Sequence, residues 1–139
     1  MDEALLAAYL ATDYRMRLPQ GGVASLRIGA PLPSALLQLT QGAPWAVLAA
    51  WNPRSQPMPR AWNRRAQRLL LAELRARPDI RAIRAAVGVG AGGWRESSLL
   101  VVGADAASMR ALCARHGQYA FIAGEGETPP RLYWTDDAP

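Results

Sequence analysis

The chain has 139 residues, of which 50% are hydrophobic and 19% are charged, a composition typical of a globular protein with its own core. No apolar segment reaches the roughly 20 residues that span a bilayer, and Asp2 and Glu3 are not typical of a secretory signal. The single cysteine excludes an internal disulfide. We therefore expect a cytoplasmic protein with no membrane partner, no metal and no cofactor.

The N-terminal part of the chain predicts a helix, a strand and a second helix. Asp2 is suited to cap a helix over 2–11. After a glycine pair, the alternation of apolar and polar residues over 25–28 is typical of a half-buried strand. A short helix over 35–41 follows and ends at Gly42.

Residues 45–51 are seven consecutive apolar residues with prolines on both sides. A short, continuous apolar run between turn signals predicts a strand that is buried on both faces, and therefore a strand at the centre of a sheet. The prolines define its ends because they donate no ladder hydrogen bond. A long helix follows over about 60–77 and is stopped by Pro78.

The second half of the chain predicts four more strands and one more helix. In order, these are a strand over 80–89, an apolar strand over 99–102, a helix between Asp105 and Gly117, a strand over 119–123 and a last strand over 132–135. From residue 45 onward the order is therefore β-α-β-β-α-β, the split β-α-β arrangement of ferredoxin-like folds.

We therefore predict one α+β domain over 1–139 with a mainly antiparallel sheet. Its ferredoxin-like (split β-α-β) core spans about 44–124, with an N-terminal helix-strand-helix extension over 1–43 and a C-terminal strand at about 130–135. The helices are expected to pack chiefly on one face of the sheet. The expected contacts bring the apolar residues of the two core helices, Leu70, Leu74, Met109 and Leu112, against Val47, Leu100 and Val102.

This topology collects polar residues at one edge of the sheet, because two core strands end at the edge where the other two begin. Asn63 shares a helical face with Leu70 and Leu74, so its amide is expected to face the sheet. We therefore predict a polar pocket at this edge. Its candidate ligand-binding residues are Asn52, Arg54, Ser55, Asn63, Trp94, Glu96, Ser97 and Gln118.

Five short stretches carry a resemblance to a known family. They are residues 26–29, 51–55, 63, 94–99 and 117–120. Their pattern resembles the bacterial family named domain of unknown function 3293, and the resemblance extends from about Tyr9 to about Trp134. The block at 51–55 followed by Asn63 is its most specific part. The resemblance implies no activity, because the family is uncharacterised, but it marks these residues for attention.

The candidate residues also have structural interpretations. Asn52, Ser55 and Asn63 could simply tie the proline-rich loop to the start of the helix, which is a common use of such side chains, and we favour this reading slightly. Glu96 and Ser97 are adjacent on a strand and point to opposite faces, so they cannot form a catalytic pair by themselves. An ion pair of Glu96 with Arg54 or Arg27 is the expected arrangement.

Two further motifs have structural interpretations that we prefer. The glycines over 88–93 could suggest a phosphate loop, but such a loop leads into a helix, whereas this one leads into Trp94 and a strand. We expect a flexible bend. Cys113 and His116 share the buried face of a helix, where they are expected to belong to the core rather than to a metal site or a nucleophilic dyad.

All sixteen basic residues are arginine, and the net charge is +5. Codon bias in a GC-rich genome explains the absence of lysine more simply than selection does. On the long helix Arg64, Arg68 and Arg75 form a narrow stripe that could bind phosphates. We favour the solvated face of an amphipathic helix, and we do not expect nucleic acid as the main partner.

Three classes of function remain open from the sequence. The first is a non-catalytic binding or interaction module whose polar pocket takes an unknown small molecule or protein partner. The second is a small enzyme that uses Glu96 as a general acid or base in that pocket. The third is weak nucleic-acid binding through the arginine stripe. No residue is assigned a catalytic role.

Overall fold

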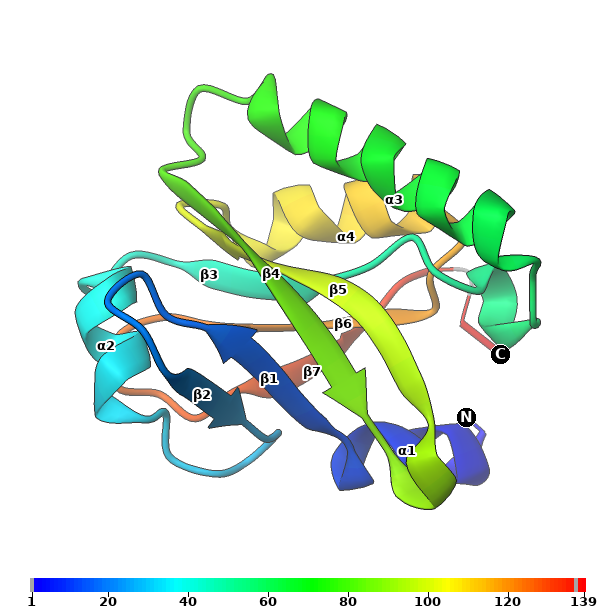
Figure 1. The fold of residues 1–139 in the computed structure, drawn as a ribbon, viewed down its shortest axis with the longest axis horizontal. Coiled ribbons are helices and arrows are strands. Elements are labelled where there is room, and N and C mark those ends of the chain that lie inside the picture. The colour runs from blue at the N-terminus through cyan, green and yellow to red at the C-terminus, as the bar shows by residue number, and fades with distance from the viewer. Residues whose placement is uncertain (1, 137) are drawn as a thin grey trace.

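The computed structural model describes residues 2–136 and 138–139, and it shows an α+β protein (Figure 1). The elements in chain order are α1 (Glu3–Ala11), β1 (Asp13–Arg17), β2 (Val23–Leu26), α2 (Ser34–Thr40), β3 (Trp45–Leu48), α3 (Arg60–Arg75), β4 (Ala82–Val89), β5 (Arg95–Val102), α4 (Ala106–Arg115), β6 (Ala120–Gly124) and β7 (Arg131–Trp134). Short 3-10 turns lie at Pro53–Ser55 and Ala91–Gly93. Among the residues described, none of the helices is long and apolar enough to span a bilayer.

The strands form one seven-stranded sheet in the order β2-β1-β4-β5-β3-β6-β7, and every neighbouring pair is antiparallel. This confirms the predicted antiparallel sheet and places β3 in its interior, between β5 and β6. The sheet curls, and the backbone N–H of Gly29, after β2, donates to the carbonyl of Pro130, before β7, over 2.9 Å. The two edges of the sheet are thereby drawn toward each other.

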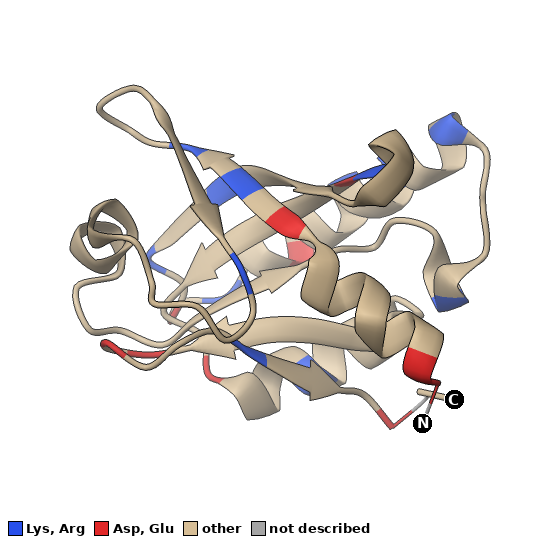
Figure 2. Cartoon of the chain, turned by 90° about the horizontal axis from the view of Figure 1, so that it is seen from below, with Lys and Arg blue, Asp and Glu red and all other residues tan. Residues whose placement is uncertain are grey.

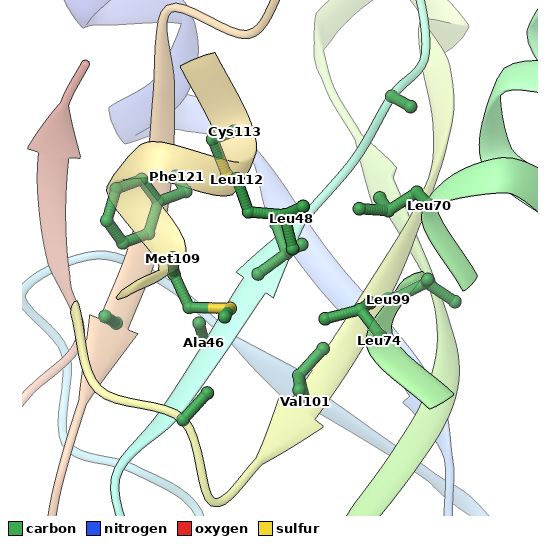
Figure 3. Packing of buried hydrophobic residues seen from close by; sticks show 13 residues of the cluster. Ala46, Leu48, Leu70, Leu74, Leu99, Val101, Met109, Leu112, Cys113 and Phe121 are labelled. Carbon is green, nitrogen blue, oxygen red and sulfur yellow. The ribbon is translucent and has the colours of Figure 1, made fainter. Parts of the chain in front are cut away.

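Each face of the sheet carries its own apolar cluster. Helices α3 and α4 cover one face, where Leu70, Leu74 and Met109 pack over β3 and β5 (Figures 1 and 3). The concave face is packed by Trp45, Val47 and other apolar side chains, together with those of α2. Because β3 is buried on both faces, all four of its residues are apolar.

The predicted helix-to-strand contacts were wrong by one residue. Leu70, Leu74, Met109 and Leu112 pack against Ala46, Leu48, Leu99 and Val101 (Figure 3), whereas Val47, Leu100 and Val102 belong to the concave face. Successive strand residues point to opposite faces, so a shift of one residue exchanges the two sets. An uninterrupted apolar run does not indicate which set faces the helices.

The predicted N-terminal helix-strand-helix extension was also incomplete. Residues Asp13–Arg17 form β1, which pairs with both β2 and β4, so this part of the chain contains a hairpin rather than one strand. Tyr14 and Met16 are the buried residues of β1. Two apolar residues in five are too few for the alternation to be recognised.

Helix α1 lies beside the turn that joins β4 and β5 (Figure 1). As predicted, Asp2 caps it: a carboxylate oxygen accepts a hydrogen bond from the backbone N–H of Leu5 over 3.1 Å. None of the helix residues is fully buried. The ring of Tyr9 packs edge-on against Trp134, with the ring centres 6.0 Å apart. The space between α1 and the sheet is where the candidate site lies.

Candidate functional site

A cavity of about 320 Å³ lies between α1, the turn after β4 and Ser55, and we call it the outer chamber. A smaller space of about 40 Å³, the inner chamber, lies deeper against the sheet. Tyr9, Trp94 and Glu96 line both chambers. The two chambers are therefore one site, which we call the α1 cleft.

The sheet register places Glu96 at the junction of the two chambers. In β5, Glu96 and Ser98 are two residues apart and both line the inner chamber. Across the sheet, Glu96 pairs with Gly88 of β4, which pairs with Tyr14 of β1. A Cβ atom at Gly88 would lie only 3.3 Å from the Tyr14 ring. The glycine therefore leaves room for this ring, which lines the inner chamber with Glu96.

The carboxyl group of Glu96 has no partner among the residues that the structure describes. Among the described residues, no hydrogen bond or ion pair reaches it, and Glu96 is the one charged residue that lines either chamber. Burial raises its pKa from 4.5 to about 8. The group is therefore mostly protonated at neutral pH and can donate as well as accept a hydrogen bond.

Other polar groups surround the inner chamber. Burial, with a smaller contribution from the charge of Glu96, raises the pKa of Tyr9 well above its usual value. The pKa of Tyr14 is raised by burial first and then by Tyr9 and Glu96. The buried hydroxyl of Ser98 has no hydrogen-bond partner among the described residues. Gln118 is held in place because its Nε2 donates to the carbonyl of Trp51 over 3.1 Å.

A different group of predicted residues pairs within itself. The backbone N–H of Asn52 donates to Oδ1 of Asn63 over 2.9 Å, and Nδ2 of Asn63 donates back to Oδ1 of Asn52 over 2.7 Å. The same Asn52 oxygen accepts the N–H of Met58 over 3.1 Å. These bonds tie the proline-rich loop to the first turns of α3. The contacts match the structural interpretation of the pair.

The structure thus divides the eight candidate residues. Ser55, Trp94, Glu96 and Gln118 line the α1 cleft, whereas Asn52, Arg54, Asn63 and Ser97 lie outside it. Ser97 points to the other face of β5, beside Trp51 and Arg64. Arg54 is exposed, and its backbone N–H donates to the carbonyl of Gly117 over 2.7 Å.

The expected ion pair of Glu96 with Arg27 or Arg54 does not form. Arg27 instead binds Asp13 over 3.1 Å. Among the described residues, Arg54 forms no ion pair with Glu96 either. Because β1 pairs with β2, with Tyr14 opposite Leu26, Asp13 is a nearer carboxylate for Arg27, which directly follows β2.

Residues 48–121, more than half of the chain, match the family model DUF3293, which is described as a protein of unknown function. The chain belongs to this family. The matched region runs from the end of β3 into β6 and contains Glu96 and Gln118, whereas Tyr9 and Tyr14 lie before it. No curated protein and no solved structure matches the chain.

Four residues of the site in this DUF3293 protein were not predicted from its sequence: Tyr9, Tyr14, Gly88 and Ser98. Ser98 could have been found, because it lies two positions after Glu96 on a strand and must share its face. The two tyrosines could not, because their position depends on α1 and on the unrecognised strand β1.

The other motifs of this DUF3293 protein have structural roles in the described residues. Cys113 is buried, and burial raises its pKa to about 12, so it is a neutral thiol at neutral pH. His116 is 3.0 Å from Glu73 through its Nε2. The glycine-rich stretch forms the turn Ala91–Gly93 and leads into β5, not into a helix.

The arginines are exposed on several elements. Arg64, Arg68 and Arg75 are all exposed on α3. In the view from below, the basic segments lie on different strands, turns and helices (Figure 2). This distribution is that of solvated surface residues.

Proposed function

We propose that this protein binds a small molecule in the α1 cleft, with Glu96 as its main polar contact. The observation that carries the proposal is the half-buried carboxyl group of Glu96, which has no partner among the described residues and lies next to a cavity of about 320 Å³. Burying such a group is unfavourable unless a hydrogen-bond or charge partner is supplied. The described part of the chain supplies none, so a ligand is the natural partner.

The walls of the outer chamber support the same proposal. Leu5, Ala8 and Ala91 make much of its lining apolar. The side chain of Trp94 is 45% exposed at the site, which is high for a tryptophan. The cavity volume lies at the lower end of the range of about 300–1,000 Å³ for small-molecule sites, which combine apolar walls with a few polar groups.

We also propose that the central part of the fold is ferredoxin-like. Two observations support this interpretation. The elements from β3 to β6 follow the chain order β-α-β-β-α-β, and their strands are arranged in space as β4-β5-β3-β6. In this interpretation the β1–β2 hairpin and β7 extend the sheet at its two edges, and the α1 cleft is a product of the N-terminal extension.

A thermal-shift screen with a set of metabolites tests the binding proposal. The proteins are the wild type, Glu96→Gln, Trp94→Leu and a matched control, Ser97→Ala, which changes the other face of β5. A ligand at about 100 times its Kd adds about 2.7 kcal/mol of stability, which is readily measured. We expect at least one compound to stabilise the wild type and Ser97→Ala but not the two cleft variants.

Two results of this screen would contradict the proposal. One is a set of compounds that stabilise all four proteins equally, because they would bind elsewhere. The other is a set that covers cationic, neutral and anionic metabolites of suitable size and stabilises none of the proteins.

A second candidate function is acid–base catalysis by Glu96. The specific observation in its favour is the pKa of about 8, because a general acid or base is most effective when its pKa is near the working pH. The inner chamber has the volume for a water molecule beside this carboxyl group. Incubation of the identified ligand with wild type and Glu96→Gln, followed by mass spectrometry, separates the two functions. A ligand recovered unchanged identifies a binding protein.

A further inference from the structure

The described residues that line the α1 cleft include one carboxyl group and no basic side chain, in a chain with sixteen arginines. The nearby basic side chains are engaged or point elsewhere. Arg15 and Arg27 bind Asp13 over 3.2 and 3.1 Å. Arg95 precedes Glu96 on β5, so it points to the opposite face, and it is exposed. The described part of the chain thus forms no ion pair with Glu96, which leaves its carboxylate open to a positive charge from a ligand.

Four aromatic residues line the inner chamber together with Glu96. They come from different parts of the fold: Tyr9 from α1, Tyr14 from β1, Trp94 from the residue before β5 and Phe121 from β6. The face of an aromatic ring carries a partial negative charge and attracts cations, most strongly for tryptophan. A carboxylate beside aromatic rings is an environment that attracts an organic ammonium group.

The charges of the site also disfavour other ligand classes. An anion would be repelled by ionised Glu96, and the described residues that line the two chambers include no basic side chain to attract it. The titratable groups that face Glu96 are Tyr9 from α1 and Tyr14 from β1, whereas β4 contributes Gly88. A neutral polar ligand is the main competitor, because it could pair with protonated Glu96.

We infer that the ligand of the α1 cleft is a small organic cation, an amine with an apolar body, whose ammonium group pairs with the Glu96 carboxylate. This inference rests on the proposed binding function and specifies its ligand class. The apolar body would occupy the outer chamber, and the ammonium group would lie among the aromatic rings at the junction of the two chambers. Pairing requires ionised Glu96, so at about pH 7 binding releases roughly one proton from it.

Three probes with the same phenylethyl body test the inference: phenethylamine, 2-phenylethanol and 3-phenylpropionate. Isothermal titration calorimetry at about pH 7 and low salt measures their affinity for the full chain. We expect the amine to bind at least about tenfold more tightly than the alcohol, and the carboxylate to bind more weakly still. Repeating the titration in two buffers with different ionisation enthalpies measures the released proton.

The variants locate the charge that selects the amine. Glu96→Gln keeps the shape of the site, so it should bind the amine and the alcohol with similar affinity and release no proton. Trp94→Leu should weaken amine binding. Ser97→Ala and Glu125→Gln, which alter the other face of β5 and an exposed turn, should behave as wild type. Circular dichroism confirms that each variant is folded.

Each alternative outcome has a distinct meaning. Equal affinity for amine and alcohol, with both lost in Trp94→Leu, overturns the cation assignment and leaves the binding function standing. Tighter binding of the carboxylate overturns the assignment as well. A preference for the amine that persists in Glu96→Gln also overturns it, because the charge would then be recognised elsewhere. If none of the probes binds while the metabolite screen identifies a neutral or anionic ligand, the inference fails alone.

Discussion

Two polar clusters that the sequence places at one edge of the sheet differ in how their atoms are paired. Asn52 and Asn63 donate to and accept from each other, so their amides are occupied by the chain. In the α1 cleft, Glu96 and the hydroxyl of Ser98 have no such partners among the described residues. Polar side chains therefore stabilise the fold in one place and remain available to a ligand in the other. The two clusters differ in whether their polar atoms already have hydrogen-bond partners within the described residues.

The largest expected effect is at Glu96. Its folded-state pKa of about 8 exceeds the usual 4.5, so the folded protein holds a proton that the unfolded chain has lost. Stability should therefore fall as the pH rises from about 4.5 to about 8 and then level off. Glu96→Gln removes this loss, so it should be more stable than wild type by about 3 to 5 kcal/mol at pH 9 and nearly equal at pH 5.

Urea denaturation at the two pH values measures this difference. The matched control is Glu125→Gln, which replaces an exposed carboxylate and should show no comparable pH dependence. An equal stability of Glu96→Gln and wild type at pH 9 would mean that the carboxyl group is well hydrated, and it would remove the contrast between the two clusters.

The next effect is expected at Asn63, which is 2% exposed. Asn63→Ala leaves the N–H of Asn52 unpaired and removes a donor to its side-chain oxygen. Unpaired buried groups of this kind reduce stability by about 1 to 3 kcal/mol. We expect a loss of about 3 kcal/mol at both pH 5 and pH 9, with unchanged probe affinity in the folded protein. If Asn63→Ala loses binding but keeps its stability, Asn63 belongs to the ligand site instead.

A smaller effect, of the opposite sign, is expected at Ser98. Its buried hydroxyl has no partner, so removing it should not break a bond. Ser98→Ala is expected to have the stability of wild type or to gain up to about 1 kcal/mol in urea denaturation. A loss of stability in Ser98→Ala would show instead that a bound water already satisfies the hydroxyl.

The smallest effect is expected on the exposed arginines of α3, which belong to neither cluster. Arg64→Glu combined with Arg68→Glu should change the free energy of unfolding by less than about 1 kcal/mol, because exposed charges contribute little. Filter binding with labelled RNA and DNA should show at most weak retention at low salt. Sequence-selective retention near physiological salt, lost in the double variant, would instead establish a nucleic-acid surface.

The sequence predicted the antiparallel sheet and the central strand because the signals are local. The apolar run from Trp45 and its flanking prolines define β3, and Asp2 defines the start of α1. Which residues of β3 face the helices could not be predicted, because a strand that is apolar at every position shows no alternation. It depends on which neighbours reach each face, and those neighbours are distant in sequence.

The candidate site was partly predictable for a similar reason. Convergence of the strand ends pointed to Glu96, Trp94 and Gln118, which do line the α1 cleft. The cleft itself required β1 to pair with β4, across about seventy residues of chain, and no local pattern reports such a pairing. The tyrosines that complete the site are therefore visible only in the folded protein.

The weak attachment of α1 has a consequence for the motions of the molecule. None of its residues is fully buried, in contrast to α3, where Leu70 and Leu74 are 0% exposed. Segments with little buried surface open locally at a small fraction of the free energy of global unfolding. The amides of α1 should therefore exchange with deuterium long before those of α3. A molecule could then enter and leave by transient detachment of a nine-residue helix, while the sheet beneath stays closed.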